Sequence, residues 1–259
     1  MLRSLIFALS FLTILPLRAG EIHPEQLPQS GAFFPVAGWF IGFCLVAAGW
    51  GMLALGMSAF LVAVLLVTCE AWLTRGLHLD GVADLLDGLG GSFDREKRLA
   101  IMKDSAIGTF GVVGLVLVLL LKTSALTSLL SSMLQGAAFS FSLPLCLAFV
   151  PAAARFAITF LAYRSRYPRA SGTGHAFVGK TRGWHVALGF FFLTPVLFGA
   201  DMNASGLMPV VCCFAASILP SLLLRLHGHK LLGGITGDVL GAGCEFGEVV
   251  GWLTLALFV

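Results

Sequence analysis

Carboxylate side chains are concentrated in one stretch of an otherwise apolar sequence. Five aspartates lie between residues 80 and 104, and three of them, Asp80, Asp84 and Asp87, are spaced i, i+4 and i+7. On a helix this spacing places the three carboxylates on one face, where like charges repel unless a cation lies between them. Hard oxygen ligands of this kind suit Mg²⁺ or Mn²⁺, which bind through one or two carboxylates and the phosphates of a substrate.

An acidic cap on a membrane helix is the alternative interpretation of these aspartates. In that case Arg95, Lys97 and Arg98 would neutralise them from the following segment. The leucines and valine between the aspartates instead indicate a helix at membrane depth, where ionisable side chains are costly and usually functional.

A second acidic group lies near the end of the sequence. Asp238 and Glu245 are seven residues apart and Glu248 follows three residues later, which again places them near one helix face. Two such groups at one membrane surface can hold one or two metal ions and leave a carboxylate free as a general base. The alternative is that these are helix-packing carboxylates paired with Arg155 or Arg225.

Basic residues gather around a glycine- and serine-rich segment, residues 163–185. They are Arg164, Arg166, Arg169, His175, Lys180 and Arg182. Such donors suit the phosphates of a substrate. A cytoplasmic loop that is basic for reasons of membrane topology has the same composition, so the charges alone leave both interpretations open.

Glu70, Arg75 and His78 flank the end of an expected membrane helix. They form either an internal ion pair beside an imidazole ring or part of a substrate site. His227 and His229 have no third nitrogen ligand nearby in the sequence, which argues against a zinc site.

The composition identifies the elements that must position these residues. Of the 259 residues, 58% are hydrophobic and 11% are charged, whereas an ordinary soluble domain carries about 25% charged residues. The net charge of +3, without a long basic run, excludes a disordered chain and a nucleic-acid-binding surface. The sequence therefore predicts an all-α polytopic membrane protein, a single integral membrane domain over residues 1–259.

Apolar runs predict about seven transmembrane helices and, before them, an N-terminal interfacial or re-entrant helix. The spans are expected near residues 33–53, 58–78, 107–121, 136–161, 186–200, 207–224 and 239–258. The connectors 79–106, 162–185 and 225–238 each hold two or more lysines or arginines. Those near 54–57, 122–135 and 201–206 together hold only one basic residue, Lys122. This layout puts every basic connector on one side, which we expect to be the cytoplasm.

Several longer motifs occur in order over nearly the whole chain. They are FLTILPL (11–17), FFPVAGWFIG (33–42), GLHLDGVADLLDG (76–88), IMKDSAIGTFG (101–111), RYPR (166–169), FVGK (177–180) and GGITGDVLGAGCEFGE (233–248). With these motifs the chain closely resembles the cobalamin synthase family, the adenosylcobinamide-GDP ribazoletransferases. Pro168 departs from the family pattern, which has a small residue there, and this departure leaves the acidic motifs intact.

The resemblance implies the last assembly step of the nucleotide loop of vitamin B12. Family members join adenosylcobinamide-GDP to α-ribazole or its 5′-phosphate and release GMP, and we expect the 5′-hydroxyl of the riboside to attack. The resemblance further implies a divalent metal, Mg²⁺ or Mn²⁺, and a multi-pass protein of the bacterial inner membrane whose active site faces the cytoplasm. The other nucleotide-loop enzymes are its expected protein partners.

Roles for individual residues are hypotheses from their spacing and from this reaction class, which depends on positioning and charge stabilisation. Metal binding is assigned to Asp80, Asp84, Asp87 and Asp104. Catalysis is assigned to Asp238 as general base, with Glu245 and Glu248 assisting it or positioning substrate. Substrate binding is assigned to Glu70, Arg75, His78 and Arg155, and to Lys103, Arg166 and Lys180 as phosphate ligands.

Two other functions fit parts of the sequence. The segment DGVADLLDG is reminiscent of CDP-alcohol phosphotransferases, but Asp84 stands where that family has arginine, and no second D-x-x-x-D pair follows Asp87. A cation transporter would use intramembrane carboxylates, distributed through the membrane depth. The acidic residues here gather toward one end of the expected spans, which favours the enzyme.

Overall fold

The computed structural model describes residues 1–18, 20, 23, 26–135, 142–199 and 204–259, the side chains of 204 and 205 excepted. All regular elements in these ranges are helices. In chain order they are α1 (Leu2–Leu12), α2 (Leu27–Ser30), η2 (Gly31–Phe33), α3 (Phe34–Ala54), α4 (Ala59–Leu73), α5 (Leu77–Gly91), α6 (Arg95–Ile101), α7 (Thr109–Leu134), α8 (Leu143–Ala162), η3 (Thr173–Ala176), α9 (Gly183–Phe191), η4 (Thr194–Gly199), α10 (Ala204–Leu231) and α11 (Gly237–Ala256).

Long apolar helices confirm the predicted all-α polytopic membrane protein. Five helical segments within the described ranges are long and apolar enough to cross a membrane, namely Leu27–Ala54, Thr109–Leu134, Leu143–Ala162, Gly206–Leu231 and Gly237–Phe258. The α4–α5 pair passes the same test as one bent unit, which makes up to six spans. The predicted count of about seven is therefore approximate. Residues 136–141 at the start of one expected span and residues 201–203 of the connector 201–206 lie outside the described residues.

The expected continuous helix over residues 58–78 is interrupted by a bend. Arg75 (φ 56°) and Gly76 (φ 64°) are left-handed, and the Gly76 N–H donates to the Ala71 carbonyl oxygen over 2.8 Å. Two left-handed residues end a helix, and glycine adopts this conformation without the cost that a Cβ brings. Helix α5 therefore leaves at 91° to α4 and carries the aspartates in a new direction.

The expected span near residues 186–200 is also broken. Helix α9 ends at Phe191, and a short 3-10 helix, η4, follows with Pro195 in its first turn. Proline has no N–H to donate and its ring disfavours continuation of the preceding helix, so this segment does not form one long α-helix.

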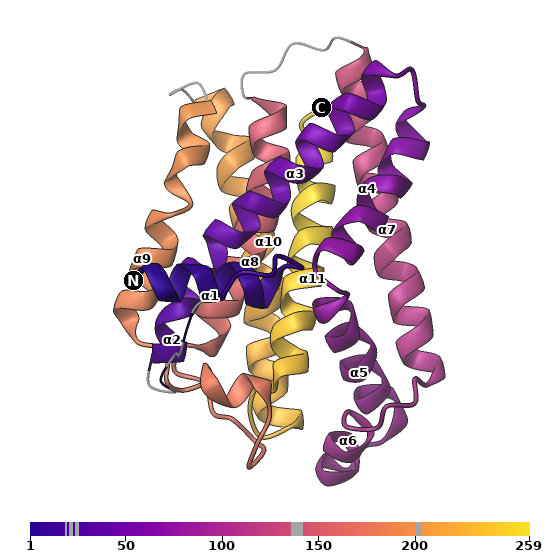
Figure 1. Ribbon diagram of the computed structural model, residues 1–259. Helices are drawn as coiled ribbons and strands as arrows, with labels where there is room; N and C mark the ends of the chain where they lie inside the picture. The colour runs from indigo at the N-terminus through magenta and orange to yellow at the C-terminus, as the bar shows by residue number, and fades with distance from the viewer. Residues whose placement is uncertain (19, 21–22, 24–25, 136–141, 200–203) are drawn as a thin grey trace.

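Helix α1 lies across the long helices in Figure 1. It has 11 residues, too few to cross a hydrocarbon core about 30 Å thick, which agrees with the predicted interfacial or re-entrant helix. Arg75 donates to the carbonyl oxygens of Ser10 (3.3 Å) and Phe11 (3.2 Å), and the Ile14 N–H donates to the Leu73 carbonyl oxygen (2.7 Å). These bonds attach the end of α1 to the α4–α5 bend, so Arg75 has a structural partner.

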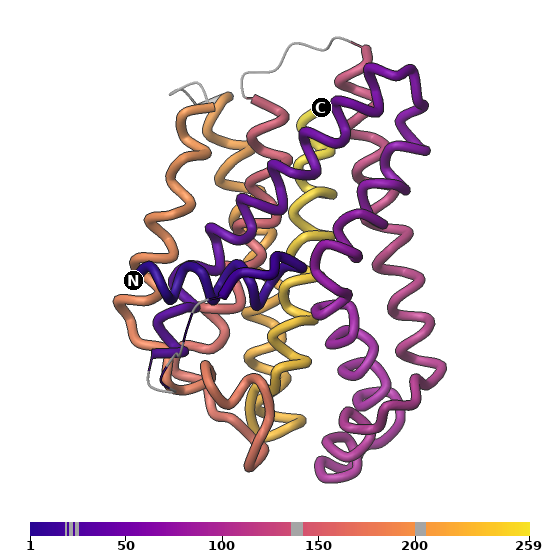
Figure 2. The backbone as a smooth tube through the Cα atoms, viewed as in Figure 1, coloured from indigo at the N-terminus to yellow at the C-terminus, as the bar shows by residue number. Residues whose placement is uncertain are grey.

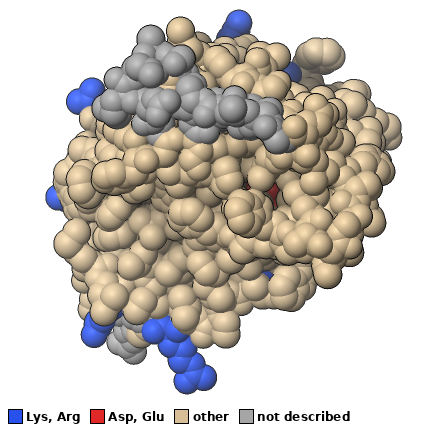
Figure 3. Space-filling model, turned by 90° about the horizontal axis from the view of Figure 1, so that it is seen from above, with Lys and Arg blue, Asp and Glu red and all other residues tan. Residues whose placement is uncertain are grey.

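The two ends of the helix bundle differ in charge. Figures 1 and 2 show α6, the end of α5, the segment 163–182 and the turn before α11 together at the lower end. Figure 3, seen from the opposite end, shows mostly uncharged side chains with Lys and Arg near the margin. The basic connectors therefore share one end of the bundle, as predicted.

Helices α3 and α8 pack with their backbones in close contact. A Cβ atom on Gly38 or Gly42 would overlap the backbone of Pro151 or Ala148, respectively. Small residues that allow such close approach are typical of helix pairs within membranes. The backbones of α3 and α8 are therefore packed too closely to admit a side chain at Gly38 or Gly42.

We expect Gly42→Ala to lower the free energy of unfolding by about 1–3 kcal/mol, because the added methyl group forces the two backbones apart. Gly51→Ala in the same helix is the matched control, since a Cβ atom there meets nothing within 4 Å. Thermal unfolding in detergent measures both variants. Equal melting temperatures for the two variants would contradict the α3–α8 packing described above.

Candidate active site

The two acidic motifs meet where α5 packs against α11. Gly81 makes this contact possible, because a Cβ atom there would lie 2.7 Å from the carbonyl oxygen of Asp238. Asp80 and Asp84 lie near enough to Asp238 for mutual electrostatic repulsion. Asp80 is exposed and Asp84 is half-buried, and among the described residues neither carboxylate has a hydrogen-bond or ion-pair partner. The structure thus brings together three of the predicted site residues.

Asp238 occupies the first turn of α11 and has defined partners. The Thr236 side chain caps the helix by accepting from the Val239 N–H (3.3 Å), and it donates to Asp238 Oδ2 over 3.2 Å. Arg169 Nη1 lies 3.0 Å from the same carboxylate oxygen. Arg169 was named among the basic residues of this segment that suit substrate phosphates, but no pairing with Asp238 was predicted for it. The predicted base is therefore held by a cation and a hydroxyl group.

Tyr167 supports the position of Arg169 from the same segment. Its hydroxyl group donates to the Ser171 carbonyl oxygen over 3.3 Å, which closes a short turn around Arg169. Burial raises the pKa of the Tyr167 hydroxyl above its usual value, so this group remains a hydrogen-bond donor at neutral pH.

Asp87 and Asp104, two of the predicted metal ligands, make backbone hydrogen bonds. The Asp87 carboxylate accepts from the N–H groups of Gly108 (2.7 Å) and Gly111 (2.8 Å) at the start of α7. Asp104 Oδ1 accepts from the Ala106 N–H over 3.0 Å. A carboxylate at a helix N-terminus satisfies free N–H groups and interacts favourably with the helix dipole. The buried Asp87 thus joins α5 to α7.

We expect Asp87→Asn to lower the free energy of unfolding by about 2 kcal/mol, because two hydrogen bonds to a charged acceptor are weakened. The Mg²⁺ concentration that gives half-maximal turnover is expected to stay at the wild-type value. Thermal unfolding and a metal titration of turnover measure the two effects. An unchanged melting temperature with a strongly raised metal requirement would instead make Asp87 a metal ligand.

Asp80 and Asp84 are the two predicted metal ligands whose carboxylates accept no hydrogen bond in the described ranges, and Asp104 lines the open groove beside them. In the ranges that the structure describes, no group of three or more His, Cys, Asp or Glu side chains is arranged to hold a metal ion. Asp80 and Asp84, with Asp238 nearby, offer the oxygen donors that Mg²⁺ uses when substrate phosphates complete its coordination. The donor chemistry therefore fits a metal shared with substrate and does not fit a closed protein cage.

Asp80 lines two hollows. The first, which we call the open groove, has a cavity volume of about 820 Å³, and its lining includes Asp80, Asp84, Lys103 and Asp104. The second, which we call the aromatic pocket, has a cavity volume of about 170 Å³ and includes Asp80 and Asp238 in its lining. The acidic group is thus accessible from two directions.

Exposed cations lie in the open groove and in the segment 163–182. Lys103 lines the groove, and Arg166 and Lys180 are exposed in the segment 163–182. Lys180 Nζ lies 3.4 Å from His175 Nδ1, and none of the three cations has a carboxylate partner among the residues described. Their charges are therefore available to an anionic substrate.

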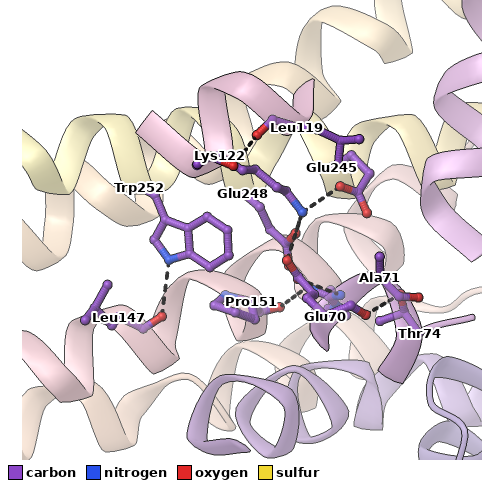
Figure 4. A network of polar contacts seen from close by, with 12 residues as sticks. Glu70, Ala71, Thr74, Leu119, Lys122, Leu147, Pro151, Glu245, Glu248 and Trp252 are labelled. Atoms are coloured by element: carbon purple, nitrogen blue, oxygen red, sulfur yellow. Dashed lines mark hydrogen bonds and ion pairs between the residues drawn. The ribbon is translucent and has the colours of Figure 1, made fainter. Parts of the chain in front are cut away.

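A separate ion network lies in the interior of the bundle (Figure 4). Lys122 Nζ is 3.1 Å from Glu70, 2.6 Å from Glu245 and also paired with Glu248. Arg155 pairs with Glu248 and lies 3.5 Å from Glu70. Each of these side chains is at most 4% exposed. The network connects α4, α7, α8 and α11.

Four predicted site residues belong to this network. They are Glu70, Arg155, Glu245 and Glu248. None of them lines the open groove or the aromatic pocket. His78 lies between the two regions, because it lines the aromatic pocket and is within electrostatic reach of Glu70, Lys122 and Arg155. The alternative interpretation of Glu245 and Glu248, carboxylates paired with Arg155 for helix packing, describes their placement here.

The sequence analysis did not predict that Lys122 lies in the interior of the bundle. The sequence placed it in a connector at 122–135, whereas α7 continues to Leu134 and holds Lys122 in its middle, 2% exposed. The signal was a single lysine within an apolar run, since an ionisable side chain at membrane depth requires partners.

Comparisons with known proteins agree with the motifs. The family model for cobalamin-5-phosphate synthase matches residues 4–256. A protein of Geotalea daltonii named adenosylcobinamide-GDP ribazoletransferase is 37% identical, over 98% of this chain and 97% of its own. Proteins of the same name from Syntrophobacter fumaroxidans and Chlorobium phaeobacteroides are 41% and 37% identical, over 94% and 98% of this chain and 94% and 97% of their own. No solved structure gives a significant match.

The family resemblance carried by the sequence motifs is thereby confirmed over almost the full length. The matches include both acidic motifs, whose aspartates the fold brings together where α5 meets α11. The chain belongs to the cobalamin-5-phosphate synthase family.

Proposed function

We propose that this protein is an adenosylcobinamide-GDP ribazoletransferase that acts on α-ribazole or its 5′-phosphate and requires Mg²⁺, with Mn²⁺ as a substitute. One observation carries the proposal. Asp80, Asp84 and Asp238 lie close together, and Asp80 lines both an open groove that contains Lys103 and a second, more apolar pocket. A bulky pyrophosphate donor in the groove and a smaller acceptor in the pocket can both reach Asp80.

The proposed reaction is a phosphoryl transfer. A hydroxyl oxygen of the acceptor forms a bond to the phosphorus that carries cobinamide, the bond from that phosphorus to the bridging oxygen breaks, and GMP leaves. In α-ribazole 5′-phosphate the 5′-oxygen is already esterified. The expected attack by a 5′-hydroxyl therefore cannot apply to that acceptor, and we propose a secondary ribose hydroxyl as the attacking group.

We assign the role of each residue in this reaction from its position in the structure. Asp80 and Asp84 would hold Mg²⁺, which when bound offsets the negative charge of the pyrophosphate. Lys103 binds the donor phosphates from the groove, and Arg166 and Lys180, which are exposed in the segment 163–182, are assigned as further phosphate ligands. Asp238 accepts the proton of the attacking hydroxyl, and Arg169 and Thr236 fix the orientation of its carboxylate.

Glu245 and Glu248 have a supporting role in this proposal. Their partners Lys122 and Arg155 hold α11 against three other helices, and α11 in turn carries Asp238. The catalytic role predicted for these two glutamates is replaced here by positioning, because their carboxylates are buried against cations.

The site is proposed to face the cytoplasm of a bacterial inner membrane. The acidic cluster consists of Asp80, Asp84 and Asp238. The start of α11, which carries Asp238, lies toward the end of the bundle where the basic connectors gather (Figure 1). Basic loops remain on the cytoplasmic side during membrane insertion. The other nucleotide-loop enzymes, whose products this step would use, are the proposed protein partners.

Release of GMP tests the proposed function. Detergent-purified protein is mixed with adenosylcobinamide-GDP, α-ribazole 5′-phosphate and Mg²⁺, and GMP is measured beside the cobalamin absorption spectrum. We expect equal amounts of GMP and cobalamin product, and none with EDTA. Folded protein that releases no GMP but releases CMP from a CDP-alcohol would replace this proposal with the phosphotransferase alternative.

A further inference from the structure

Three phenylalanine rings from distant parts of the chain meet beside the acidic cluster. Phe11 of α1, Phe34 of α3 and Phe177, just after η3, contact one another with ring centroids 5.3–6.2 Å apart. All three rings line the aromatic pocket, together with Ile158 and Leu240. One wall of this pocket is therefore aromatic and apolar.

Empty volume distinguishes this cluster from ordinary core packing. Protein interiors leave few voids larger than a water molecule, because side chains interdigitate. The aromatic pocket has a cavity volume of about 170 Å³, slightly more than the roughly 150 Å³ of an apolar cavity that binds benzene, so it can hold the flat ring system of a base. Glycines 81, 174, 237 and 241 also line the pocket, and their missing Cβ atoms allow α5, η3 and α11 to pack closely beside it.

The polar groups of the pocket are few and lie together. His78, Asp80 and Asp238 are the ionisable side chains in its lining. His78 is 3% exposed, and its Nδ1 atom is buried without a hydrogen-bond partner among the described residues. A buried ring nitrogen without a partner is costly, so a ligand that supplies one gains binding energy here.

The aromatic pocket and the open groove share Asp80 and Leu77 in their linings. A molecule with a flat apolar part against the phenylalanines would have an adjoining polar part near Asp80 and Asp238. Since Asp80 also lines the groove, a hydroxyl group there would be next to the hollow that we assign to the donor phosphates.

We propose that the aromatic pocket binds the heterocyclic base of the acceptor nucleoside, with Phe11, Phe34 and Phe177 as its aromatic wall and His78 as hydrogen-bond partner of a ring nitrogen. The assignment rests on the proposed function for the acceptor's identity. Stacking of a base on aromatic side chains contributes about 1–3 kcal/mol per base. The wall favours a bicyclic base such as benzimidazole over a bare sugar phosphate.

Two measurements on the full-length protein in detergent test the pocket. The first is binding of benzimidazole and of α-ribazole, without donor or metal, by titration calorimetry. The second is the steady-state KM for acceptor and for donor. The test variants are Phe177→Ala and Phe177→Leu, the second of which keeps apolar volume but loses the ring. Phe7→Ala is the matched control, because Phe7 stacks on Phe11 (5.5 Å) without lining the pocket.

We expect Phe177→Leu to weaken benzimidazole binding and to raise the acceptor KM about tenfold, with the donor KM unchanged. Phe7→Ala should stay within about twofold of the wild type in both measurements. A folded Phe177→Leu variant with unchanged benzimidazole affinity and acceptor KM would overturn the assignment. A second result would also overturn the assignment: benzimidazole does not bind the wild type, and a fatty-acyl probe binds the wild type and the variant equally. The pocket would then be a lipid site.

The two proposals fail in different ways. If the wild type binds benzimidazole and loses it in Phe177→Leu, but releases no GMP with any donor, then the pocket assignment stands and the proposed reaction is wrong. If GMP is released normally and Phe177→Leu changes neither the acceptor KM nor benzimidazole binding, the reaction stands and the pocket assignment is wrong.

Discussion

Asp84→Asn is expected to lower kcat/KM by about 10³-fold or more while leaving the protein folded. Asp84 is half-buried, and its carboxylate has no hydrogen-bond or ion-pair partner within the described part of the chain, so asparagine fits without breaking a contact. The substitution removes one of the two negative charges that we assign to Mg²⁺. Loss of one electrostatic contribution of this kind costs about 10²–10³ in rate, and a lost metal contribution costs more.

The matched control for this prediction is Glu96→Gln. Glu96 is an exposed acidic residue in α6, outside the lining of either hollow. Turnover at saturating substrate and Mg²⁺ is compared for the wild type and both variants, with thermal unfolding as the test of fold. Normal turnover by Asp84→Asn would refute the metal assignment. A parallel loss in Glu96→Gln would attribute the effect to general surface charge.

Lys122→Met is expected to destabilise the protein by about 3–5 kcal/mol, enough to abolish accumulation of folded protein. Lys122 contacts Glu70, Glu245 and Glu248 and lies 5.5 Å from the ring centroid of Trp252 (Figure 4). Without it, Glu70 and Glu248 share Arg155, and Glu245 has no ion-pair partner among the described residues. An uncompensated charge in a low-dielectric interior costs far more than an intact ion pair contributes.

The double variant Lys122→Met with Glu245→Gln separates charge from volume. It removes one charge of each sign, and we expect it to recover part of the lost stability. Lys97→Met is the control, because Lys97 is exposed in α6. Folded yield and melting temperature by fluorescence-detected size exclusion measure all four proteins. A stable single variant, or a double variant less stable than the single one, would contradict an electrostatic role for the network.

Much of the fold and part of the site could be predicted from the sequence. Apolar runs predicted the long helices, and the i, i+4, i+7 spacing predicted that Asp80, Asp84 and Asp87 lie on one helix, which α5 confirms. The motifs also predicted that the two acidic segments share one end of the bundle. These properties are local, or they follow from charge placement along the chain.

Contacts between helices could not be predicted in the same way. Periodicity does not indicate which helices meet. The partners of Lys122, which are Glu70, Glu245 and Glu248, could therefore not be predicted from the sequence. Asp87 had the same spacing as its neighbours, yet the start of α7 occupies its oxygens. The bend after α4 depends on two left-handed residues, Arg75 and Gly76. The sequence places an arginine and a glycine there but does not specify their backbone conformation.

The buried ion network has a consequence for how the chain enters its membrane. Glu70, Lys122 and Arg155 are synthesised first, so two cations face a single carboxylate until α11 brings Glu245 and Glu248. Unneutralised charges at membrane depth are costly, so the earlier helices remain incompletely assembled while the last one is translated. We therefore expect integration of the chain to be completed by its final helix, whose two glutamates balance the charge of Lys122 and Arg155.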